Sequence, residues 1–326
     1  MYGLHDLLMR RITLSESGRD SFFDPPRESH CSPGYWVSVA ARARDRNLSV
    51  ADLNIPADRS GYAQAIGIET ALNQRDGYPF GRRHQGQTYS PLVVIADRSD
   101  VDKAVADVSG CVRAQFPEQD LGGFVGDLCS VIGDLHDNVW SHAERTGISV
   151  AQRWAHPGTD RKHHIVEFAV ADCGRGLLRE LQRSGVAGRL AITSHQEAIA
   201  WCIQKGHSSK IREDDGWAQQ LPEDAMGNPI GPNARTFSTG NHHMGLGLYK
   251  LTSLVERYAG RLWIASGDTL LSIDGLGAKT YIQVPCHWQG VTLACRFYTG
   301  RVRQRVADQK ADELSLSLLE LMGSPP

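Results

Sequence analysis

Three polar residues recur at four-residue intervals in the segment "DLHDNVWSH", residues 134–142. Asp134, Asn138 and His142 lie at positions i, i+4 and i+8, so in a helix they share one face. A carboxylate, an amide and an imidazole in line could hold a cation and orient a water molecule, because hard cations such as Mg²⁺ take oxygen ligands. By itself, the pattern is more typical of an ordinary solvated helix face.

A carboxylate followed by two glycines in "VADCGRGLL" forms the second candidate. Asp172 ends a predicted strand, and Gly174 and Gly176 follow at once. The two glycines allow a sharp turn and let the backbone approach a ligand closely. A carboxylate at the end of a strand can accept a hydrogen bond from the amino group of a base. A simple turn from strand to helix would show the same residues.

The third candidate is the stretch "MGLGLYKLTSLVERYAGRLWIAS", residues 244–266, in which Gly245 and Gly247 begin an apolar helix. Glycine is a poor helix former and costs about 1 kcal/mol relative to alanine. Its presence at a helix start suits the close approach of a phosphate to the free N–H groups of the first turn. The alternative is a joint between loop and helix built from small residues.

The order and spacing of the three stretches together resemble the GHKL family of ATP-binding domains. This family includes type II topoisomerases, mismatch-repair ATPases, sensor histidine kinases and anti-sigma-factor serine kinases. Its N-box helix matches "DLHDNVWSHA", with Asp134 where Glu is more usual. Its D-x-G-x-G box matches "DCGRG", and its G-x-G-L box with the following helix and strand matches "GLGLYKLTSLVERYAGRLWIAS". The resemblance covers roughly residues 117–298.

The resemblance implies a role for each matching residue. Asn138 would bind the Mg²⁺ that bridges the triphosphate, and Asp134 would be the general base or would position the water. Asp172 would read the adenine amino group. The remaining residues implied at the nucleotide are His142 on the N-box helix, Gly174 and Gly176 shaping the pocket, and Gly245, Leu246 and Gly247 offering backbone N–H groups to phosphate.

A threonine on a late strand is expected beside the adenine in this family. Two places compete, Gly290 with Thr292 and Gly277 with Thr280, and neither is a clean Gly-Thr pair. We favour Thr292, because an aromatic residue and a glycine just before an apolar strand are the commoner arrangement.

The segment between the second and third boxes, Leu177 to His243, corresponds to the ATP lid of the family. Its basic residues could close on the γ-phosphate, where charge develops during transfer or hydrolysis. They could equally belong to a solvated loop. The residues of interest are Lys205, Lys210 and Arg212, together with the pair His242–His243, which could hydrogen-bond phosphate.

The resemblance and the order of elements predict an α/β fold of the α+β sandwich kind. It would have a mixed, mainly antiparallel sheet with helices on one face. We expect a smaller N-terminal α/β domain over residues 1–115, the ATP-binding domain over 116–298 and a helical tail over 299–326. Strands are expected within 35–45 and 89–97, and over 148–155, 163–172, 260–266, 269–274, 279–285 and 290–298. Helices are expected over 99–116, 120–147, 176–185, 195–206, 247–259 and 306–323.

Composition limits the classes of protein to consider. The chain has 326 residues, 41% of them hydrophobic, which suffices for a substantial core and for two domains. Its net charge of −2 shows no basic bias of the kind that nonspecific nucleic-acid binding needs. Seven scattered cysteines without a C-x-x-C pair argue against a zinc site and a disulfide framework. Without an apolar signal core or a membrane span, the expectation is a cytoplasmic protein.

Three functions remain open. The chain could be an Mg-ATP-binding regulator that hydrolyses or clamps ATP to control a protein partner, a kinase that phosphorylates Ser or His of a separate partner, or a non-catalytic nucleotide-binding scaffold. Asp134 is one methylene shorter than Glu, so hydrolysis could be slow or absent. A homodimer is possible, and no membrane partner is expected.

Overall fold

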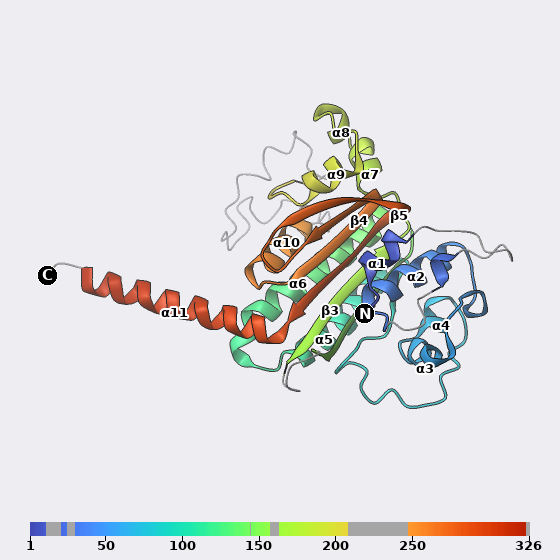
Figure 1. Ribbon diagram of the computed structural model, residues 1–326, viewed down its shortest axis with the longest axis horizontal. Coiled ribbons are helices and arrows are strands. Elements are labelled where there is room, and N and C mark those ends of the chain that lie inside the picture. The colour runs from blue at the N-terminus through green and yellow to red at the C-terminus, as the bar shows by residue number, and fades with distance from the viewer. Residues whose placement is uncertain (11–20, 25–29, 144, 157–162, 208–246, 324–326) are drawn as a thin grey trace, which may run out of the picture.

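The computed structural model describes residues 1–10, 21–24, 30–143, 145–156, 163–207 and 247–323, drawn in colour in Figure 1. Its described strands form one five-stranded sheet in the order β1-β2-β3-β5-β4. Every neighbouring pair is antiparallel, so this α+β sheet is more uniform than the mixed sheet expected. The strands are β1 Val93–Ile95, β2 Gly147–Ala155, β3 His164–Asp172, β4 Arg261–Ile273 and β5 Lys279–Tyr298.

Three helices cover one face of the sheet. They are α5 Arg98–Gln115, α6 Gly122–Asn138 and α10 Gly247–Arg257, and their apolar residues share one core with alternate residues of the strands. On β3, for example, Phe168 and Val170 belong to this core, whereas Ala169 and Ala171 belong to the core on the other face. The alternation follows from the two-residue period of a strand.

The other face is covered by helices from the N-terminal part of the chain, as Figure 1 shows in blue. The segment 35–45, expected to hold a strand, is instead part of a helix. That helix begins with Pro33 at its first position, where the missing N–H has no intrahelical partner to lose. Because nearly every residue of this helix is buried, apolar residues occur on all of its sides and show no clear helical period. These helices are α1 Leu4–Met9, α2 Pro33–Asp45, α3 Ala57–Ala65 and α4 Ile68–Ala71.

The boundary expected near residue 115 does not separate two sheets. β1, from the first 115 residues, pairs with β2, and α5 packs beside α6. Among the described residues, the N-terminal part therefore has no sheet of its own and serves as the second layer and one edge of the common sheet.

The remaining elements extend or interrupt those expected. In place of the single helix expected over 120–147, the structure has a 3-10 turn at Gln119–Leu121, then α6, then a π-helical turn at Val139–Ala143. The four late strands merge into two long ones, β4 and β5. The other described helices are α7 Leu177–Arg183, α8 Val186–Arg189, α9 His195–Cys202, the 3-10 turns Ser21–Phe23 and Val50–Asp52, and α11 Thr299–Gly323, which projects from the body in Figure 1. No described helix is both long and apolar enough to cross a membrane.

A buried carboxylate joins the two layers. Glu167 on β3 has no exposed surface. Its Oε1 accepts hydrogen bonds from the Ser32 hydroxyl at 2.8 Å and the Gly34 N–H at 2.9 Å, at the start of α2. Its Oε2 accepts two from the guanidinium of Arg296 on β5, at 2.8 and 2.6 Å. The carboxylate thus satisfies free donors at a helix start and is neutralised by a cation at the same time.

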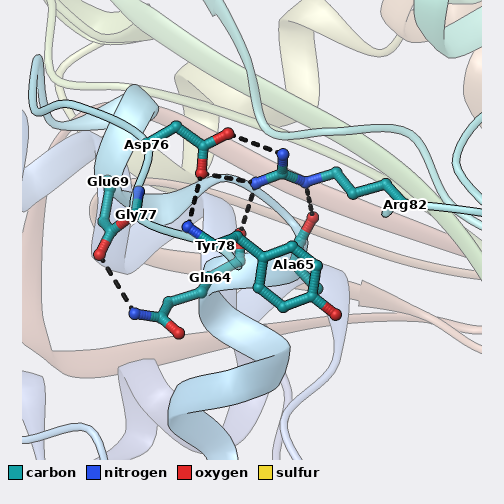
Figure 2. Close-up of polar contacts among 7 residues, drawn as sticks. All are labelled: Gln64, Ala65, Glu69, Asp76, Gly77, Tyr78 and Arg82. Atoms are coloured by element: carbon teal, nitrogen blue, oxygen red, sulfur yellow. Dashed lines mark hydrogen bonds and ion pairs between the residues drawn. The ribbon is translucent and has the colours of Figure 1, made fainter. Parts of the chain in front are cut away.

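A second polar network holds the loop between α4 and β1 against the body (Figure 2). Arg82 donates to both carboxylate oxygens of Asp76, at 2.7 and 2.8 Å, and to the carbonyls of Ala65 and Gln64 at the end of α3. Glu69 on α4 accepts from the Gln64 amide at 3.2 Å. The Arg82 guanidinium therefore attaches a long irregular segment to the end of α3.

Replacing Glu167 by alanine should strongly destabilise the protein, because it leaves the Arg296 charge buried without its partner. We expect the free energy of unfolding to fall by about 3 kcal/mol or more, measured by urea denaturation. Asp120, whose side chain is 80% exposed and pairs with Lys310, provides the control. Its change to Asn should leave the free energy of unfolding nearly unchanged, because solvent screens an exposed ion pair. Equal losses for the two variants would contradict this view of Glu167.

Candidate functional site

The first and third sequence stretches meet where α6 and α10 pack together. Gly247 is the first residue of α10. A Cβ atom on it would lie 3.1 Å from Cβ of Asp134 and 3.4 Å from Nδ2 of Asn138. The structure therefore brings Gly247 next to Asp134 and Asn138, three residues that the family resemblance implies at one nucleotide. It also gives the glycine a packing reason, because the helices approach closely at this point.

A lysine that the sequence analysis did not single out joins this group. Lys250 on α10 places its Nζ 3.0 Å from Oδ2 of Asp134. The side chain of Asp134 is only 4% exposed and that of Lys250 is 38% exposed, so the carboxylate is fixed in the interior and the ammonium reaches it from the surface. Lys250 follows Gly247 by three residues, which puts both on one helix face; that spacing was the available signal.

Asp172 ends β3 and turns its carboxylate back onto the following backbone. Oδ1 accepts the Gly174 N–H at 2.8 Å and, at the long distance of 3.4 Å, the Val291 N–H. Burial raises the pKa of Asp172 to about 7, although both hydrogen bonds favour the ionised form and lower it. Within the described residues, no cation pairs with Asp172, and its Oδ2 receives no hydrogen bond.

Two glycines allow β5 to approach the turn after Asp172. Gly176 and Gly290 both have positive φ angles, +75° and +93°. A Cβ atom on Gly290 would lie 2.4 Å from the carbonyl oxygen of Asp172 and 2.6 Å from the Gly174 nitrogen. The Ser266 hydroxyl donates to the Gly290 carbonyl at 2.9 Å. The turn is thus closed by direct backbone contact, which only glycine permits at position 290.

Thr292 faces α2, on the side of the sheet opposite α6 and α10. It is fully buried, and its hydroxyl lies 2.9 Å from the Ser38 hydroxyl on α2. Neighbouring residues of a strand point to opposite faces, so its neighbour Val291 packs against the core beneath α6 and α10 instead. The role of Thr292 beside an adenine stays a prediction. Thr280, the alternative, is exposed at the start of β5.

The end of α6 and the turn after β3 are linked through β2. His136 on α6 contacts the Ser149 hydroxyl on β2 at 2.8 Å, and complete burial lowers the pKa of His136 to about 3. Gly147 pairs with Asp172 across the strands. A Cβ atom on Gly147 would lie 2.3 Å from Cγ1 of Val139, the residue after Asn138. The two groups of candidate residues therefore share one face and one end of the sheet.

Several candidate residues cannot be placed. Lys210, His243, Gly245 and Leu246 lie outside the described residues, as do Arg212 and His242. His142 belongs to the π-helical turn after α6, but its side chain is outside the description. Among the described residues, no group of three or more His, Cys, Asp or Glu side chains could hold a metal ion. Any cation at Asn138 would therefore need ligands from elsewhere.

The raised pKa of Asp172 should make stability depend on pH. In the unfolded chain this carboxyl ionises near pH 3.9, so its folded form holds the proton more tightly. The contribution is complete below about pH 4 and is lost as the pH rises to about 7, by up to about 4 kcal/mol. Urea denaturation at several pH values, compared with Asp172→Asn, isolates this effect. A constant difference between wild type and variant would contradict it.

Comparisons with known proteins do not assign the chain to a family. No protein-family model matches it, no curated protein matches its sequence, and no solved structure matches it. The case for a function therefore rests on the residues and their geometry.

Proposed function

We propose that this chain is a regulatory protein of the GHKL type that binds ATP with Mg²⁺ at the site formed by α6, α10 and the turn after β3. Nucleotide binding or hydrolysis would then control a protein partner. The observation that carries the proposal is the buried carboxylate of Asp172, which has only backbone donors among the described residues. Burying a charge without a partner is costly, and a ligand that donates hydrogen bonds would offset that cost.

The adenine amino group is the donor that this position suits. Oδ1 of Asp172 is already held by backbone N–H groups, whereas Oδ2 accepts nothing from the described residues. An exocyclic amino group would donate to Oδ2 and favour the ionised carboxylate. Guanine presents a carbonyl oxygen at the corresponding ring position, and a carbonyl oxygen cannot donate a hydrogen bond to the carboxylate. The site therefore favours adenine over guanine.

The phosphates would lie at the start of α10. The N–H groups of a first helical turn have no intrahelical partner and attract anions, and Gly247 keeps this helix start free of side-chain bulk. Asn138, beside Gly247, offers an amide oxygen of the kind that Mg²⁺ accepts. When bound, Mg²⁺ would neutralise part of the phosphate charge, with phosphate oxygens and water completing its ligands.

Titration calorimetry tests this proposal. We expect wild type to bind an ATP analogue with an imido bridge between the β and γ phosphorus atoms, and to do so more tightly with Mg²⁺. Asp172→Asn should lower the affinity at least about tenfold, because the amide cannot replace a charged acceptor. Asn138→Ala should remove most of the gain from Mg²⁺.

Asp127→Asn is the matched control for the Asp172 change. Asp127 lies on α6, is 56% exposed and pairs only loosely with Arg257, at 3.6 Å. Its variant should bind as wild type does, and a GTP analogue should bind more weakly than the ATP analogue. No binding by folded wild type, or equal binding by the Asp172 variant, would refute the proposed site.

A further inference from the structure

The proposed nucleotide site does not yet give a role to Lys250, a charged residue beside it. Lys250 lies one turn into α10, on the side that packs against α6, and contacts the carboxylate that would face the phosphates. We propose that Lys250 distinguishes a nucleoside triphosphate from a diphosphate, by moving its ammonium group from Asp134 to the terminal phosphate. This inference rests on the proposed function.

The first argument is that the two side chains of this ion pair differ in conformational freedom. Asp134 is buried at 4% exposure on a helix that packs into the core, whereas Lys250 is 38% exposed. A lysine ammonium is a compact charge on a flexible four-carbon stem. The ammonium group can therefore change its partner by side-chain rotation, whereas the buried carboxylate keeps its place.

The second argument is the crowding of negative charge that a triphosphate would cause. Cβ of Asp134 lies 3.1 Å from the Cβ position of Gly247, at the start of α10. Phosphates bound at that helix start would thus meet the Asp134 carboxylate as a nearby like charge. Two anions in a partly buried site repel strongly unless a cation screens them. Lys250 is within reach of both.

The binding of a nucleoside diphosphate would depend less on the Lys250 ammonium. The phosphate chain is one phosphoryl group shorter, so with the adenine held at Asp172 it brings less negative charge to the Asp134 end. The ion pair between Lys250 and Asp134 would then stay closed. With a triphosphate the ammonium moves to the added phosphate.

The test compares the affinities of ADP and of the imido ATP analogue by calorimetry on the full chain. Wild type should prefer the analogue, and Lys250→Met should reduce that preference about tenfold by weakening analogue binding while changing ADP binding by no more than about threefold. Lys250→Arg keeps the charge and should retain most of the preference. Lys279→Met removes a lysine from an exposed pair with Glu256 and should change neither affinity.

A double-mutant cycle keeps the inference testable even if Lys250→Met folds poorly. Asp134→Asn should strengthen analogue binding, because Lys250 no longer has a carboxylate to leave, and this gain should disappear in the Asp134→Asn/Lys250→Met double variant. Equal losses of ADP and analogue affinity in Lys250→Met, or additive effects in the cycle, would overturn the inference while leaving the nucleotide site standing. Failure of wild type to bind either nucleotide would overturn both.

Discussion

The contact on which the structure most depends is the ion pair of Glu167 with Arg296. The two residues face each other across β3 and β5, and the same carboxylate accepts donors at the start of α2. A slip of one residue in the pairing would send Arg296 to the opposite face and leave a buried charge unpaired. The pair therefore fixes both the register of the two central strands and the attachment of the N-terminal helices.

That register has a consequence at the far end of the same strands. With Glu167 opposite Arg296, Ala171 lies opposite Thr292, and the turn after Asp172 meets Gly290. The chain thus holds two buried carboxylates on β3 in contrasting states. Glu167 is fully satisfied and structural, whereas Asp172 lacks a countercharge in the described structure, and burial raises its pKa to about 7. This contrast is the reason why we propose Asp172 as a position for a ligand.

Local sequence patterns predicted the elements that carry the site, and they missed features set by distant contacts. The apolar runs ending at Ala155 and Asp172 predicted β2 and β3, and the Gly247 start of α10 was expected from its glycines. The face of Thr292 could not be read from its neighbours, because one residue of register decides it. The helix α2 was missed because its aromatic and β-branched residues suggest a strand. Because it is buried on nearly all sides, it also lacks the apolar period that marks a surface helix.

The packing of α6 against α10 was predictable in part. The four-residue spacing of Asp134 and Asn138 was sufficient to place them together on one face, but the partner helix lies more than a hundred residues away. The spacing of Gly247 and Lys250 places Lys250 on the same face of α10, but its ion pair with Asp134 depends on the contact between the two helices. Local patterns did not reveal that the N-terminal part shares the sheet, since β1 has only three residues.

A crystal structure of the chain grown with the imido ATP analogue and Mg²⁺ would test the central claim most directly. The account requires the adenine amino group within hydrogen-bonding distance of Oδ2 of Asp172, with the phosphates at the start of α10 beside Asn138. Nucleotide bound at another place, or bound here with its base directed away from Asp172, would contradict it.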